Sequence, residues 1–132
     1  MALVTRSSDA SLDATTGMKA PQLTGLLAGE NIDAVAPCYI KSSDGKLYMS
    51  NGTAANEAAE FVGVSAAAAR AGEAVTVFGL GARFRYGTGL TPGDVLYIAA
   101  TAGRLDTAAT TGDAVGVAQV ITSTDIRVTR VI

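Results

Sequence analysis

Short segments of this 132-residue chain recur in the same order in its two halves, and this internal repeat limits the possible folds more than any other feature. The four matched pairs are Tyr39-Ile40 with Tyr97-Ile98, Gly45-Lys46-Leu47 with Gly103-Arg104-Leu105, Val62-Gly63-Val64 with Val115-Gly116-Val117, and Val75-Thr76 with Val128-Thr129. The first two pairs are 58 positions apart and the last two are 53 positions apart. Ordered matches of this kind predict two related structural units that share one core.

Each half consists of short β-prone runs separated by turn residues. The runs are residues 39–41, 46–49, 61–64, 74–78, 83–86, 95–98, 114–121 and 126–131. Asp44-Gly45 and Asn51-Gly52 favour tight turns, because Gly and Asn adopt positive φ readily. The sequence therefore predicts an all-β fold, a small sandwich or barrel built from two related strand–turn–strand units, with halves at about residues 28–79 and 90–132.

Residues 54–71 leave a choice between helix and strand. Their Ala and Glu content favours a helix, whereas the matching stretch around residues 114–124 is rich in β-branched residues. We expect a strand at 61–66, and a helical turn within 54–60 is compatible with Asn56 as its N-cap.

Residues 1–27 differ from the rest of the chain. They are rich in Ser, Thr, Asp and Ala and lack a strand or helix period, which predicts an extended N-terminal arm before a single β-domain at residues 28–132. Its spaced apolar side chains, which suit docking onto another surface, are Leu3, Val4, Leu12, Met18, Leu23, Leu26 and Leu27. A disordered leader is the alternative. We expect removal of residues 2–20 to leave the β-domain folded with an unchanged melting transition.

The composition excludes several classes of function. Ten Lys and Arg against 12 Asp and Glu give a net charge of −2, so we expect neither nucleic acid nor a membrane surface as a partner. The absence of His and the single Cys38 exclude His-based catalysis, His-containing zinc sites and an intrachain disulfide. We therefore expect no enzyme activity, no cofactor and no metal, and we expect Cys38 to be a small buried residue.

Two glycine pairs, Gly79-Leu80-Gly81 and Gly87-Thr88-Gly89, resemble part of a phosphate-binding loop. Phe84 stands where the third glycine of a dinucleotide-binding motif belongs, and the chain has no Gly-Lys-Ser or Gly-Lys-Thr. We interpret these glycines as bends at strand ends.

Between the two glycine pairs, basic and aromatic residues alternate as Arg83, Phe84, Arg85 and Tyr86. In a strand this order puts both arginines on one face and both rings on the other. It predicts an interface strand whose rings meet an apolar surface and whose guanidinium groups pair with carboxylates of a partner or a neighbouring subunit.

A family resemblance rests on the order of strand and turn phrases along residues 28–132. The phrases are Ala28-Gly29-Glu30, Tyr39-Ile40, Glu60-Phe61-Val62-Gly63-Val64, Ala71-Gly72-Glu73-Ala74-Val75-Thr76-Val77, Leu90-Thr91-Pro92-Gly93-Asp94-Val95-Leu96-Tyr97, Gly103-Arg104-Leu105, Ala114-Val115-Gly116-Val117-Ala118 and Ile126-Arg127-Val128. With them, the chain resembles the small capsid decoration (cement) proteins of tailed bacteriophages. The resemblance implies a β-domain on the outer surface of a phage head, often a trimer, that contacts the major capsid protein through its base and an N-terminal arm.

The residues and the resemblance together predict a non-enzymatic structural protein of the virion, made in the cytoplasm of the bacterial host. Self-association is expected, because the 30 large apolar residues of residues 28–132 give a lean core, and the resemblance implies that the assembly is a homotrimer. Capsid or subunit contacts are expected at Leu3, Val4, Arg6, Leu12, Met18, Leu23, Arg83, Phe84, Arg85 and Tyr86. The alternatives are another virion module, such as a tail or fibre component that contacts a host surface, and a small β-domain enzyme or carbohydrate binder.

Overall fold

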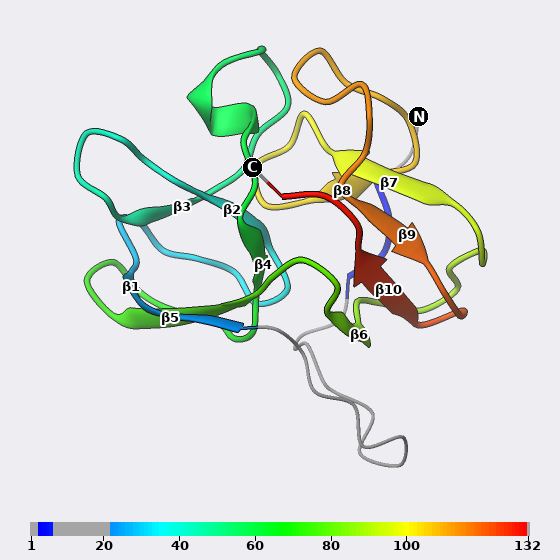
Figure 1. Cartoon of the computed structure of the whole chain (residues 1–132), viewed down its shortest axis with the longest axis horizontal. Coiled ribbons are helices and arrows are strands. Elements are labelled where there is room, and N and C mark those ends of the chain that lie inside the picture. The colour runs from blue at the N-terminus through cyan, green and yellow to red at the C-terminus, as the bar shows by residue number, and fades with distance from the viewer. Residues whose placement is uncertain (1–2, 7–21, 132) are drawn as a thin grey trace.

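The structure is a computed structural model that describes residues 3–6 and 22–131. These residues form two five-stranded antiparallel sheets that pack together as a small β-sandwich (Figure 1). The first sheet contains β1 (Gln22–Leu27), β2 (Pro37–Ile40), β3 (Leu47–Met49), β4 (Gly63–Ser65) and β5 (Ala74–Phe78). The second contains β6 (Arg83–Arg85), β7 (Val95–Ile98), β8 (Leu105–Asp106), β9 (Ala118–Val120) and β10 (Asp125–Val128). The predicted all-β fold is confirmed.

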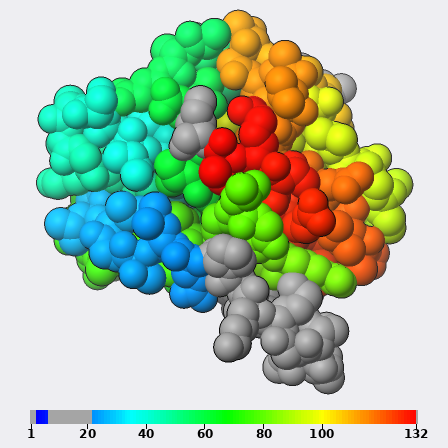
Figure 2. Space-filling view, viewed as in Figure 1, coloured from blue at the N-terminus to red at the C-terminus, as the bar shows by residue number. Residues whose placement is uncertain are grey.

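The two sheets have the same strand topology, as the internal repeat predicts. Their orders are β1-β5-β4-β2-β3 and β6-β10-β9-β7-β8. In the first hairpin Ile40 pairs with Leu47, and in the second Ile98 pairs with Leu105, each residue lying 58 positions after its counterpart. Figure 2 shows the two halves side by side, the first in blue to green and the second in yellow to red.

The second offset of the repeat needs correction. Val62 N donates to Cys38 O at 2.8 Å, and Val117 N donates to Leu96 O at 2.9 Å. Leu96 lies 58 positions after Cys38, so the counterpart of Val62 is Val117, 55 positions later. The match of Val62 with Val115, 53 positions apart, is therefore wrong by two residues. A shift of two keeps the strand alternation, so it leaves the sequence pattern intact while changing the pairing register.

The N-terminal boundary of the β-domain also differs from the prediction. We expected the β-domain to begin at residue 28, but β1 (Gln22–Leu27) already pairs with β5. A register shift between Leu23 and Leu26, with Gly25 at φ 82°, marks a bulge in β1. The bulge breaks the alternation by which a strand is recognised in a sequence.

Local predictions for residues 54–66 are confirmed. A single 3-10 turn, η1 (Glu57–Ala59), begins at Asn56, whose side chain accepts a hydrogen bond from Ala58 N at 3.0 Å. The expected strand at 61–66 is β4, which is buried along its whole length.

One apolar cluster joins the two sheets. It includes Val64 and Phe78 from the first sheet and Leu96 and Ile126 from the second. The rings of Phe78 and Phe84 lie 5.1 Å apart between centroids, where the chain passes from β5 to β6. A second, smaller cluster lies within the first half and contains Cys38, which is fully buried, as predicted. Burial raises the pKa of this thiol, which keeps it protonated and unreactive.

Asp113 organises the turn that leads into β9. Its side chain is fully buried and accepts hydrogen bonds from Ile98 N, Val115 N and Gly116 N at 2.8–3.1 Å. It also pairs with Arg130 Nη2 at 2.9 Å. The carboxylate therefore connects β7, the 113–116 turn and the segment after β10.

We predict that Asp113→Ala lowers the free energy of unfolding by about 3–5 kcal/mol, because it leaves buried N–H groups and a guanidinium without their acceptor. Urea denaturation followed by circular dichroism measures this change. Asp33→Ala, which removes a carboxylate from an exposed ion pair, is the matched control and should cost about 1 kcal/mol or less. Equal effects for both variants would contradict this role of Asp113.

The β2–β3 hairpin contains a polar contact with a pH signature. Asp44 Oδ1 accepts from Lys46 N at 2.9 Å, and its Oδ2 accepts from the Tyr48 hydroxyl at 2.6 Å. The Tyr48 hydrogen bond is the main cause that lowers the pKa of Asp44 below its ordinary value, and the same bond raises the pKa of Tyr48 to about 12.

We predict that Tyr48→Phe raises the pKa of Asp44 toward 3.8, its ordinary value. A carboxyl with a lowered folded pKa contributes stability above its ordinary pKa and loses it as the pH falls through the folded pKa. The stability difference between wild type and variant should therefore shrink as the pH falls below about 3.8. NMR titration of the Asp44 side chain measures the shift, and Tyr97→Phe, in the other half, should leave it unchanged.

Candidate interface surfaces

The strand β6 alternates as its sequence predicts, but its rings do not face a partner. Phe84 is 1% exposed and Tyr86 is fully buried, and both belong to the cluster that joins the sheets. The prediction that these two rings contact a partner is therefore wrong. Burying an aromatic ring in the adjacent core removes its apolar surface from water, which is favourable in free energy compared with leaving it exposed. Arg83 and Arg85 point to the other face, as expected.

The solvent-facing side of the second sheet carries a row of cross-strand neighbours, three of them polar and one apolar. Arg83 pairs with Arg127, Arg127 with Gln119, and Gln119 with Val95 across four neighbouring strands. The residues that flank this row along β10 are buried. The row therefore lies on one face, opposite the core. We call Arg83, Arg85 and Arg127 the arginine face.

The charges on the arginine face are not balanced. Arg83 Nε pairs with Asp125 Oδ2 at 3.2 Å. Arg85 and Arg127 are exposed, and among residues 3–6 and 22–131 neither has an ion pair. Arg83 and Arg127 are direct cross-strand partners, an arrangement in which like charges repel. A carboxylate-bearing surface placed against this face would relieve that repulsion.

Arg127 was not among the predicted interface residues. Its strand is visible in the sequence as residues 126–131, but its alignment with β6 depends on a pairing between segments 42 positions apart, as for Arg83 and Asp125. The alternation of the two runs indicates which faces their arginines occupy, whereas the register that places Arg83 beside Arg127 requires the fold.

A second surface forms where the N-terminal residues Leu3–Arg6, here called the terminal segment, lie along β8. Leu3 forms an antiparallel bridge with Asp106. Val4 N donates to Leu105 O at 3.1 Å, and Val4 O accepts from Arg104 Nη2 at 3.2 Å. The Val4 side chain is 7% exposed and belongs to the cluster that joins the sheets.

Arg6 anchors the other end of the terminal segment. Its Nη1 donates to Gly103 O at 2.7 Å, and its Nη2 pairs with Asp33 Oδ2 at 3.1 Å. The bond to a carbonyl fixes the guanidinium on the β7–β8 turn, and the exposed ion pair to Asp33 adds little.

The site also leaves space for the backbone of the terminal segment. A side chain at Gly87 would collide with the carbonyl oxygen of Thr5, so only glycine permits this approach. Next to it, the buried Tyr86 hydroxyl accepts from Leu105 N at 3.2 Å, and burial raises the pKa of Tyr86. Both polar backbone atoms of Leu105 are thus satisfied, one by Tyr86 and the other by Val4.

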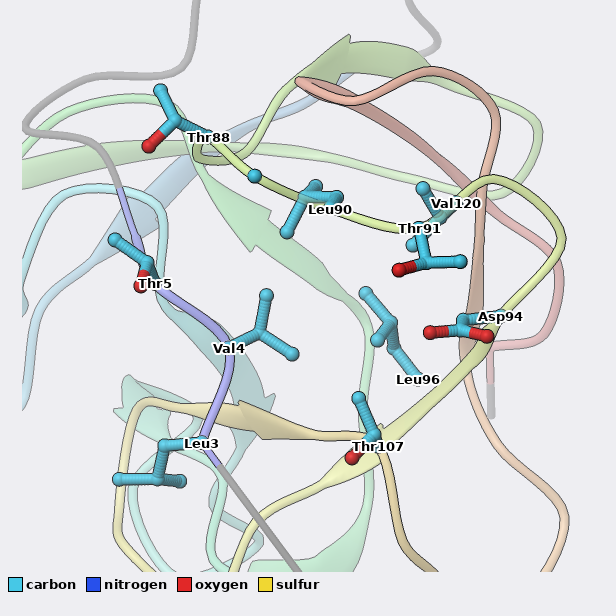
Figure 3. Close-up of a pocket in the computed structure, with 11 residues that line it drawn as sticks. Leu3, Val4, Thr5, Thr88, Leu90, Thr91, Asp94, Leu96, Thr107 and Val120 are labelled. Carbon is cyan, nitrogen blue, oxygen red and sulfur yellow. The ribbon is translucent and has the colours of Figure 1, made fainter.

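A hollow of about 200 Å³ lies beside the terminal segment. Figure 3 shows Val4 directed toward Leu90 and Leu96, while Leu3 turns to the other side of the backbone. Thr88, Thr91 and Thr107 line the rest of the hollow together with Val120. This mixture of apolar and hydroxyl groups suits an apolar side chain that enters from an extended peptide.

The other predicted contact residues are placed as follows. Leu3 and Leu23 are both 42% exposed and are available for contacts, whereas Leu12 and Met18 lie outside the described residues. The burial of Val4 also corrects our expectation about the arm. Removing residues 2–20 would take away a core side chain, so an unchanged melting transition is no longer expected.

Other large apolar side chains are also exposed on the surface. Leu27, Leu80 and Val115 are 47%, 54% and 69% exposed, and Val95 lies against Gly116. Residues 3–6 and 22–131 contain no group of three or more His, Cys, Asp or Glu that could hold a metal ion. Within the same residues, no helix is long and apolar enough to cross a membrane. Comparison of the sequence with protein-family models and with curated proteins finds no match.

We predict that Gly87→Val displaces the terminal segment while the two sheets stay folded. The segment is held against the Gly87 backbone, which the new side chain would cover. Trypsin should then cleave after Arg6 at least about 10-fold faster, because local release exposes the bond to the protease. Mass spectrometry of the released peptide measures the rate. Thr129→Val, a β-branched replacement at an exposed position that does not line the hollow, is the control and should cleave at the wild-type rate.

Proposed function

We propose that this chain is a non-enzymatic decoration protein that binds the outer surface of a phage head and stabilises the lattice of the major capsid protein. The observation that carries the proposal is the arginine face, an exposed sheet surface with three arginines and one aspartate. The order of strand and turn phrases along residues 28–132, which resembles the decoration proteins, supports the same assignment.

The chemistry of the arginine face favours an acidic protein surface as the partner. Guanidinium groups bind carboxylates with paired, directional hydrogen bonds. A sheet with one face on the core presents these groups on a rigid and nearly flat surface, which suits contact with another large protein. The chain as a whole carries a charge of −2. An acidic surface is therefore attracted by the local positive charge of the arginine face and not by the net charge of the protein.

The proposed action is mechanical. Each bound copy stabilises the assembled lattice relative to dissociated capsid protein by its own binding free energy. A homotrimer would engage three equivalent positions, so the second and third contacts form at a high effective concentration. The partners are then the major capsid protein and other copies of this chain, and the location is the outer surface of the virion after synthesis in the bacterial cytoplasm.

We predict that the double substitution Arg85→Glu and Arg127→Glu weakens binding to capsid shells by at least about 10-fold, or about 1.4 kcal/mol. Co-sedimentation with shells assembled from the major capsid protein of the same genome measures the binding. Wild-type binding should also weaken as salt increases, because the contact is electrostatic.

The matched control is Lys46→Glu with Arg70→Glu. It changes the net charge equally at two exposed positions of the first half and should leave binding unchanged. Equal losses in both double variants would show that only net charge matters. Binding to tails rather than to heads would support a tail or fibre component in place of the proposed function.

A further inference from the structure

The terminal segment occupies a position that the fold fills differently in its two halves. In the first half, Gly29 N donates to Leu47 O at 2.9 Å, so the residues directly after β1 cover the edge of β3. In the second half, Val4 N donates to Leu105 O at 3.1 Å. Leu105 lies 58 positions after Leu47. The terminal segment therefore covers the edge in the second half that residues after β1 cover in the first, although the bridge is antiparallel in the second half and parallel in the first.

This difference makes the terminal segment separable from the domain. The strand that covers β3 is continuous with β1 and cannot leave without breaking the sheet. The terminal segment is instead separated from β1 by residues 7–21 of the sequence. Its hydrogen bonds to Gly103, Arg104 and Leu105 form with any copy of the segment that reaches β8.

The length of chain between Arg6 and Gln22 permits such an exchange. Fifteen residues separate them, and an extended chain of that length spans about 50 Å at about 3.3 Å per residue. A neighbouring copy in contact with the domain lies within that reach. Exchange of an identical element preserves every contact and changes only the entropy of the connection, so it is a low-cost route to assembly.

We propose that the edge of β8 is a strand-acceptor site and that, between associated copies, it binds the terminal segment of a second copy. Recognition combines strand addition along Leu105 with two side-chain determinants. Val4 fills the apolar part of the site beside Leu96, and Arg6 binds the carbonyl of Gly103. Gly87 admits the backbone of the incoming segment.

Directed disulfide formation tests the exchange in the full-length protein without capsids, so its result does not depend on the proposed function. Leu3 and Asp106 are antiparallel partners, a geometry that suits a disulfide. One preparation carries Leu3→Cys and the other Asp106→Cys. Mixing them under mild oxidation should give at least about five-fold more disulfide-linked dimer than either alone.

A folding check and a further variant keep the result interpretable. Asp106 Oδ1 accepts from Ala108 N at 3.0 Å, so circular dichroism and a melting curve establish first that Asp106→Cys is folded. Adding Gly87→Val to the acceptor should abolish the mixed dimer. Wild type, which retains the buried Cys38, is oxidised in parallel.

The proposal is overturned if the mixture forms no more dimer than the separate variants while the double variant, Leu3→Cys with Asp106→Cys, closes a disulfide only within its own chain at every concentration. A mixed dimer that persists when the acceptor carries Gly87→Val would also overturn it, because the link would then not report strand addition at β8.

Discussion

The apolar layer between the two sheets is the constraint on which the rest of the molecule depends. The strands of the two sheets are between two and six residues long, and sheets this small need an apolar face buried against another element to be stable. The Phe78–Phe84 contact lies where the chain crosses between the sheets, so the connection itself is part of the core. A packed interior transmits local changes, and the two halves should therefore unfold together.

The repeat and the turn residues make much of this fold predictable from sequence. The hairpin around Gly45 forms where Asp-Gly predicts it, with Gly45 at φ 71°, and Asn56 caps the turn that it was expected to cap. What the sequence does not contain is register. The counterpart of Val62 is set by a hydrogen bond to Leu96, and β1 is recognisable only once β5 is available to pair with it. Both depend on contacts between distant segments, which no local pattern encodes.

The candidate interface was also predictable only where local sequence alternation decides the outcome. Alternation correctly places Arg83 and Arg85 on the solvent side of β6. It does not say whether the opposite side meets the chain's own core or a partner, and Phe84 and Tyr86 proved to be core residues. Val4 is a similar case. It ends a short apolar run, residues 1–4, which does not indicate which of its side chains is buried. The burial of Val4 depends on an edge about 100 residues away that only the fold supplies.

The two halves differ in backbone strain and in how the edges of their sheets are covered. Val35 has φ 57°, a conformation unfavourable for a β-branched residue, whereas Gly93, its counterpart 58 positions later, has φ 93° without such strain. Val35 N donates to Ser65 O and Gly93 N to Val120 O, so both halves keep the same backbone geometry. The first half adds a hydrogen bond from Ala36 N to the buried Ser65 hydroxyl, which reinforces the strained turn.

The first half also covers its own β3 edge with the residues that follow β1. The second half instead has an edge covered by the terminal segment and a solvent-facing sheet rich in arginine. Both surfaces that we propose as contacts, the arginine face and the edge of β8, therefore lie in the second half, which lacks the strained turn. The first half holds its strained turn at Val35 by internal hydrogen bonds.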